Sequence, residues 1–174
     1  MLKPLFAIGH STKPIENFIQ ILHAHAVTFL ADVRTIPRSR YNPQYEESAL
    51  ASKLEAAGLK YAHFKDLGGL RKSKPDSVNM AWENKSFRGY ADYMQTPAFE
   101  RALQKLITLS LHENIAFMCA EGNPFRCHRL LLSDALTAKN IPVYHISSTQ
   151  SKKLHTLSSF AKIEKGKVFY PVLL

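Results

Sequence analysis

Short apolar runs alternate with stretches of helical periodicity along most of this chain. The apolar runs predict strands at residues 5–9, 27–33, 59–64, 115–118 and 143–146. Apolar residues recur at helical spacing in Ile15, Phe18, Ile19 and Leu22, a helix that Ser11 or Thr12 would cap. The same spacing predicts helices over residues 46–57, from Pro97 onward, and from Pro124 to near Asn140. Strand and helix therefore alternate through the chain.

This alternation predicts an α/β protein with a mostly parallel sheet covered on both faces, a three-layer, doubly wound, Rossmann-like architecture. Residues 162–170 predict a C-terminal hairpin that turns at Lys165 and Gly166. A length of 174 residues, of which 45% are apolar, suits one compact domain over residues 1–174.

Residues 67–95 interrupt the alternation. This segment lacks clear periodicity, contains Gly68, Gly69 and the single Trp82, and ends in a short predicted helix over residues 90–94. Ordered segments of this length often bind or cover ligands. We therefore predict a lid or binding loop within the domain.

Polar residues follow four of the predicted strands, in the order His10 and Ser11, Asp32 and Arg34, Gly68 and Gly69, Cys119 and Glu121. In parallel sheets, ligands bind beyond the carboxyl ends of the strands. These side chains are therefore expected to converge in one cleft.

The stretch from Cys119 to Arg129 concentrates reactive groups where a strand pattern becomes a helix pattern. Cys127, His128 and Arg129 are predicted in the first helical turns, where free N–H groups favour an anion or lower the pKa of a thiol. The candidate catalytic residues are Cys119, Glu121, His10 and Asp32. The candidate substrate-binding residues are Ser11, Arg34, Arg40, Gly68, Gly69, Tyr90, Arg126, Cys127, His128 and Arg129.

Simpler roles remain open for several of these residues. Cys119 can be a small packed residue, Asp32 can pair with Arg34 to fix a loop, and Arg129 can pair with Glu121 or Asp134. The Cys-x7-Cys-His spacing lacks the close pairs of structural zinc sites, so no metal and no cofactor is predicted.

The net charge of +9 favours anionic partners, including a small anionic or nucleotide-like ligand and nucleic acid. Two cysteines and no recognisable export signal predict a reduced, cytoplasmic protein, and no apolar run predicts a membrane partner. The oligomeric state stays open.

Several segments together resemble the family called domain of unknown function 488. They are Ile8-Gly-His-Ser11, Asp32-Val-Arg34 with Pro37 and Ser39-Arg40, Leu67-Gly-Gly69, Gly89 to Met94, Cys119-Ala-Glu121 and Cys127-His-Arg129. The resemblance covers nearly the whole chain and implies a small cytosolic domain, but it supplies no reaction.

Three functions are compatible with these features. The first is an enzyme, a hydrolase or transferase, acting on a phosphorylated or nucleotide-like substrate. The second is a non-catalytic nucleic-acid-binding module, and the third is a thiol-based redox or sulfur-transfer protein.

Overall fold

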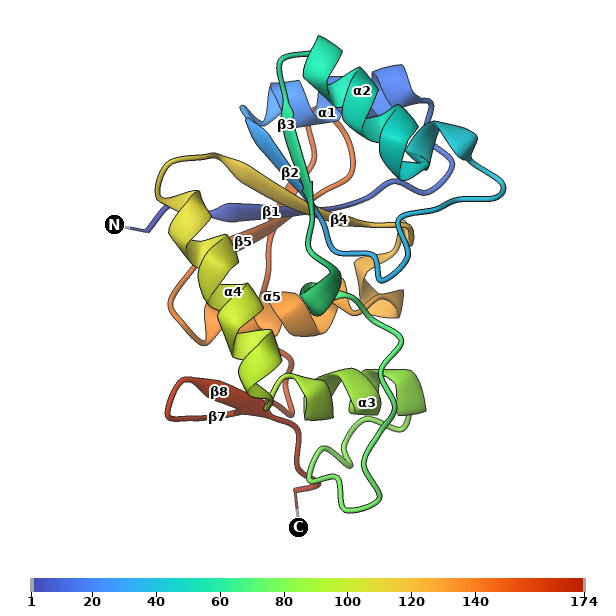
Figure 1. Ribbon diagram of the computed structural model, residues 1–174. Helices are drawn as coiled ribbons and strands as arrows, with labels where there is room; N and C mark the ends of the chain where they lie inside the picture. Colours follow the sequence, from blue (N-terminus) through green and yellow to red (C-terminus); the bar gives the residue numbers. More distant parts are fainter. Residues whose placement is uncertain (1, 174) are drawn as a thin grey trace.

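The computed structural model describes residues 2–173, which form a three-layer α/β fold with a C-terminal hairpin (Figure 1). Its main sheet has the strand order β3-β2-β4-β1-β5-β6, and the first five strands along the chain are parallel. The strands are β1 (Leu5–Gly9), β2 (Phe29–Asp32), β3 (Lys60–His63), β4 (Ile115–Cys119), β5 (Val143–Ile146) and β6 (Lys152–Leu154). The predicted fold class is confirmed.

Helices cover both faces of the sheet. The helices α1 (Ile15–Ala24) and α2 (Glu47–Ala56) pack on one face, and α4 (Pro97–Ser110) and α5 (Arg129–Thr137) pack on the other, with α3 (Lys85–Tyr93) below them (Figure 1). The chain runs from β1 to β3 toward one edge and then returns through β4 to β5. Because such crossovers are right-handed, this reversal places the two pairs of helices on opposite faces.

The reversal also positions a cleft. The strand β4 lies between β1 and β2, and the carboxyl ends of all three are level, with Gly9 beside Cys119 and Asp32 beside Met118. The chain leaves β2 toward α2 and leaves β4 toward α5, so the two loops diverge to opposite faces. Ligands in α/β sheets bind at this kind of switch point.

The C-terminal hairpin forms as predicted. The strands β7 (Lys162–Glu164) and β8 (Lys167–Phe169) pair antiparallel. Lys165 and Gly166 between them have positive φ values of 51° and 76°, as a two-residue hairpin turn requires. Val168 and Tyr170 at this end of the chain are buried in the core beside α5.

Four local details differ from the sequence prediction, although the short helix predicted before Met94 is present as the end of α3. Pro14, not Ser11 or Thr12, precedes α1, which has no side-chain cap. The predicted helix over residues 90–94 is the end of α3, which Asn84 caps from residue 85 by accepting from the Ser86 and Phe87 N–H groups. No strand was predicted at β6, an exposed antiparallel edge.

The fourth difference concerns the start of α5. Residues Pro124–Arg126 form a separate 3-10 turn, and the helix begins only at Arg129. The Asn123 side chain caps the short turn, and the extended backbone of Cys127 then separates it from the helix. Cys127 and His128 therefore precede the helix instead of lying inside it.

Candidate functional site

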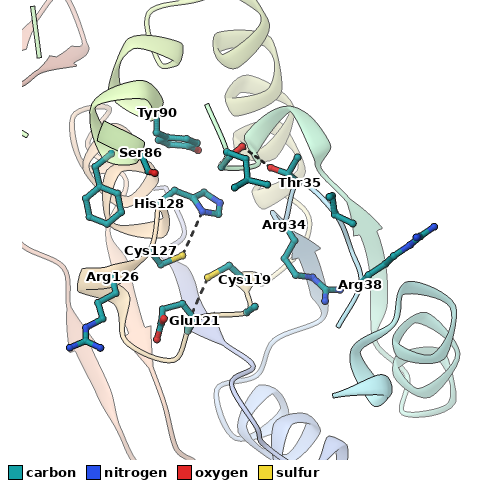
Figure 2. Close-up of a pocket in the computed structure, with 15 residues that line it drawn as sticks. Arg34, Thr35, Arg38, Ser86, Tyr90, Cys119, Glu121, Arg126, Cys127 and His128 are labelled. Carbon is teal, nitrogen blue, oxygen red and sulfur yellow. Dashed lines mark hydrogen bonds between the residues drawn. The ribbon is translucent and has the colours of Figure 1, made fainter. Parts of the chain in front are cut away.

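A cavity of about 350 Å³ opens at the switch point, between the loops that follow β2 and β4 and the start of α3 (Figure 2). Predicted site residues that line it are Arg34, Gly69, Tyr90, Cys119, Glu121, Arg126, Cys127 and His128. The other lining residues are Thr35, Ile36, Arg38, Leu70, Ser86, Phe87 and Ala120. The structure thus brings the residues after β2, β3 and β4 into one site.

Six predicted site residues do not line this cavity: His10, Ser11, Asp32, Arg40, Gly68 and Arg129. His10 is buried and stacks on Tyr45, with ring centroids 4.0 Å apart, and burial lowers its pKa to about 4. Ser11 has a positive φ of 48° and hydrogen-bonds through its N–H to the Ala120 carbonyl. These two residues hold β1 to the loop after β4.

Arg40 and Gly68 have other surroundings. Arg40 is exposed and stacks on Tyr41 outside the cavity. A Cβ added to Gly68 would lie 2.5 Å from Thr35 Oγ1. Glycine at this position therefore allows the loop after β3 to pack closely against the loop after β2. Thr35 Oγ1 then donates to the Gly69 carbonyl at 2.7 Å, which fixes one wall of the cavity.

Asp32 and Arg34 form a buried bidentate ion pair. Arg34 Nε donates to Asp32 Oδ1 at 2.9 Å and Arg34 Nη2 to Oδ2 at 2.6 Å. The Arg34 N–H and the Tyr61 hydroxyl also donate to this carboxylate. The alternative in which the pair fixes the loop is therefore confirmed, and both charges are already engaged.

Two cysteine side chains face each other at one wall of the cavity (Figure 2). Cys119 ends β4, Cys127 precedes α5, and both are buried and free of disulfides. The neighbouring Cys119 thiol is the main cause that lowers the pKa of Cys127, and burial is the main cause that raises the pKa of Cys119.

Cys127 directly precedes His128, the N-cap residue of helix α5, which has no side-chain cap of its own. The Cys127 backbone is extended, with φ −136° and ψ 148°, whereas His128 already has helical angles of −58° and −14°. The Cys127 sulfur accepts from the N–H of Arg129, the first residue of the helix, at 3.5 Å. A thiolate is favoured there by the helix dipole, and the charge of Arg129 lowers the pKa of Cys127 further.

His128 is oriented toward the same sulfur. Its Nε2 lies 2.9 Å from the Val33 carbonyl, which can only accept, so Nε2 carries a proton. Its Nδ1 lies 3.6 Å from Cys127 Sγ. The site thus places a thiol beside an imidazole that a backbone carbonyl orients.

Arg129 supports the loop that carries Cys119. Its Nη2 donates to the Glu121 carbonyl oxygen, which also accepts from the Cys119 thiol at 3.8 Å. A Cβ on Gly9 would lie 1.9 Å from that carbonyl oxygen, so glycine is required where β1 passes the loop. The predicted ion pairs of Arg129 with Glu121 and with Asp134 were wrong, because its guanidinium meets a backbone carbonyl.

The predicted lid segment packs firmly at the cavity. Gly69, Leu70, Ser86, Phe87 and Tyr90 supply one wall. Behind them, buried Asp92 accepts from the Lys74 N–H, the Ser77 hydroxyl and the Asn79 amide. Trp82 is half-buried against Phe87, Phe160 and Tyr170. Whether this segment opens stays a prediction.

Sequence reasoning missed Arg38 as a lining residue and chose its neighbour Arg40. Both arginines lie in the loop after β2. Arg38 lines the cavity, whereas Arg40 stacks on Tyr41 outside it. Residue spacing in an irregular loop gave no signal for this choice. The close approach of the two thiols likewise has no local signal.

Across residues 2–173, no group of three or more His, Cys, Asp or Glu side chains is placed to hold a metal ion. In the same range, no helix is both long and apolar enough to cross a bilayer.

Comparison with known proteins gives one family and no individual relative. No curated protein and no solved structure matches the chain. The model of the family described as Domain of unknown function DUF488 matches residues 14–136, which include β2 to β4, both cysteines and most of α5. The chain therefore belongs to the DUF488 family.

Proposed function

We propose that this protein is a thiol-dependent enzyme that exchanges disulfides through Cys127, with Cys119 as its second thiol. The observation that carries the proposal is that two free cysteines line one cavity, with His128 Nδ1 and the Arg129 N–H directed at the sulfur of Cys127. The thiolate is the nucleophile in disulfide exchange. The proposal assigns the first attack to Cys127, whereas the sequence had suggested Cys119.

In the first step, the Cys127 thiolate, which has lost its proton to water, attacks one sulfur of a substrate disulfide. A bond forms between Cys127 Sγ and that sulfur, and the substrate S–S bond breaks. The departing sulfur takes the bonding electron pair and then a proton from water. The Val33 carbonyl keeps the imidazole of His128 aligned beside the reacting sulfur.

In the second step, Cys119 resolves the mixed disulfide. Its sulfur attacks Cys127 Sγ, the second substrate sulfur leaves with the electron pair, and the Cys119 proton passes to it. The substrate disulfide is thereby reduced to two thiols, and the protein is oxidised to a Cys119–Cys127 disulfide. A low-molecular-weight thiol or a dithiol protein would restore the reduced form.

The phosphate-binding alternative has less support. Of the three arginines predicted to hold an anion, Arg34 is paired with Asp32 and Arg129 is bound to the Glu121 carbonyl, which leaves Arg126 as the one at the cavity without an ion pair among the described residues. Nucleic-acid binding stays a prediction that depends on the overall charge and on exposed Arg40 and Tyr41.

Thiol labelling tests the proposal directly. The reduced protein is treated with iodoacetamide from pH 5 to pH 9, and peptide mapping by mass spectrometry assigns each cysteine. Cys127 is expected to react at mildly acidic pH and Cys119 only slowly. The Cys119→Ser variant, incubated with 2-hydroxyethyl disulfide, is expected to accumulate a mixed disulfide at Cys127.

The wild-type protein treated in the same way should instead form the Cys119–Cys127 disulfide and release two equivalents of 2-mercaptoethanol. The Cys127→Ser variant is the matched control and should form neither product. Slow labelling of both cysteines, with no mixed disulfide in the Cys119→Ser variant, would contradict the proposal.

A further inference from the structure

Two arginines flank the cavity that contains the thiols. Arg38 follows β2 and Arg126 ends the turn before Cys127, and their side chains extend from opposite sides of the cavity (Figure 2). Both are exposed. Among residues 2–173, neither guanidinium forms an ion pair. Two cations without an ion-pair partner among the described residues therefore flank the cavity, with their guanidiniums directed outward to solvent (Figure 2).

The other charges around the cavity do not cancel these cations. Arg34 is neutralised by Asp32, and Glu121 is the acidic side chain among the residues that line the cavity. One Glu121 carboxylate oxygen accepts from the Asn123 N–H at 3.1 Å, so part of its charge is engaged by the loop. The field at the entrance therefore favours anions.

The cavity itself limits the size of the substrate. The side chains of Cys119 and Cys127 are 4% and 6% exposed, so the reacting sulfur has to enter the cavity. Its volume of about 350 Å³ lies near the lower end for small-molecule sites. Ile36, Leu70, Phe87 and Tyr90 give its walls apolar surface that suits an uncharged S–S group with its carbon neighbours.

From this arrangement we infer the substrate class: a low-molecular-weight disulfide whose ends carry carboxylate or other anionic groups. The inference rests on the proposed thiol chemistry and adds the role of Arg38 and Arg126, which attract the charged ends while the disulfide reaches Cys127. Each arginine attracts one charged end of the substrate. The two cations thus select the substrate by charge, and the thiols perform the exchange.

Two reagent pairs of similar size test the charge preference. Iodoacetate and iodoacetamide differ mainly in charge, as do the dianion 3,3′-dithiodipropionate and the neutral 2-hydroxyethyl disulfide. For each pair, the ratio of the anionic to the neutral rate at Cys127 is measured in 20 mM and in 500 mM NaCl. Division by the neutral rate removes any change in the reactivity of the thiol itself.

The ratio is expected to fall about three-fold in Arg38→Gln and in Arg126→Gln, and further in the double variant, because each change removes one nearby charge. Arg101→Gln, an exposed arginine on α4 outside this cavity, is the control for net charge and should leave the ratio unchanged. High salt should reduce the ratio of the wild-type protein toward that of the double variant.

The two proposals fail separately in this experiment. Fast neutral exchange with a ratio that is equal in wild type, double variant and control would overturn the substrate class and leave the thiol chemistry standing. Absence of exchange at Cys127 with either disulfide would overturn the thiol chemistry. An equal fall in Arg101→Gln would also overturn the substrate class, since the effect would then belong to net charge.

Discussion

Helix α5 carries two buried polar clusters that differ in how completely their hydrogen bonds are made. At its start, the Cys127 sulfur lies 3.6 Å from His128 Nδ1 and accepts from the Arg129 N–H at 3.5 Å, beside a cavity. In its middle, Asp134 is fully buried and accepts from His155 Nε2, the N–H and hydroxyl of Ser158, and the Tyr170 hydroxyl, at 2.7–3.1 Å. The first cluster borders a cavity, whereas the second has both oxygens of its carboxylate bonded.

The Asp134 cluster extends through a second histidine. Because Asp134 can only accept from His155 Nε2, His155 Nδ1 is free to accept from His145 Nε2, which lies 2.9 Å away. Burial lowers the pKa of His145 to about 4, so this histidine is neutral at physiological pH. The cluster joins α5, β5 and the C-terminal segment, and the fully bonded Asp134 carboxylate at its centre indicates a role in stability, whereas the buried His145 Nδ1 at its edge has no partner among the described residues.

The largest expected effect is on the Asp134 cluster. Asp134→Asn replaces an acceptor of four hydrogen bonds with an amide that carries its own N–H groups. Leaving buried donors unpaired typically costs several kcal/mol, so we expect a loss of about 3–5 kcal/mol in the free energy of unfolding. Urea denaturation measures it. A loss below about 1 kcal/mol would show that the cluster does not hold the fold.

The second prediction concerns the pH dependence of stability at the thiol cluster. Between the lowered pKa of folded Cys127 and the ordinary thiol value, the unfolded chain holds a proton that the folded chain lacks. Stability from this group therefore rises with pH through that window and is lost as the pH falls. The raised pKa of Cys119 acts only above the ordinary value.

We expect the free energy of unfolding of wild type, relative to Cys127→Ser, to increase from pH 5.5 to pH 8. The slope should stay below the limit of about 1.4 kcal/mol per pH unit for one proton. Parallel urea titrations of both proteins provide the comparison. Superimposable pH profiles would mean that Cys127 is a neutral thiol in the folded protein.

The third prediction isolates the effect of the Cys119 thiol on the pKa of Cys127, of whose lowering it is the main cause. Cys119→Ala removes the thiol, whereas Cys119→Ser keeps a hydroxyl that can donate to the Cys127 thiolate. The pKa of Cys127 should rise in the alanine variant by at least about one unit, a tenfold loss of thiolate at acidic pH. Iodoacetamide labelling at pH 5.5 reads this out. Equal rates in the two variants would assign the lowered pKa to His128 and Arg129 instead.

The sequence predicted the architecture because most strands and helices have a recognisable local pattern of apolar residues. Apolar runs such as Leu5–Gly9 and helical spacing in α4 depend on burial that every α/β sheet imposes. The switch-point rule then placed Arg34, Cys119 and Glu121 at one cavity. The strand β6 was missed because Lys152 and Lys153 are exposed at an edge, where no apolar pattern is required.

The hydrogen-bond partners inside the site were not predictable in the same way. Asp134 and His155 are 21 residues apart, and their contact depends on how the segment after β5 folds back over α5. Which of Cys119 and Cys127 is the thiolate depends on which sulfur accepts from the Arg129 N–H. The φ and ψ angles of Cys127 place its sulfur there. Sequence spacing contains neither fact.

The smallest expected effect tests whether the two clusters on α5 are independent. Tyr170→Phe removes one hydrogen bond to Asp134 and keeps the aromatic ring that packs on Trp82 and Phe160. We expect a loss of about 1 kcal/mol in the free energy of unfolding, and an unchanged pH profile of Cys127 labelling. The charge of Arg129 lowers the pKa of both Cys127 and His145, so Arg129 is the route by which the clusters would communicate. A shifted labelling profile in Tyr170→Phe would therefore reveal that coupling. The Cys127 cluster and the Asp134 cluster could then no longer be treated as independent.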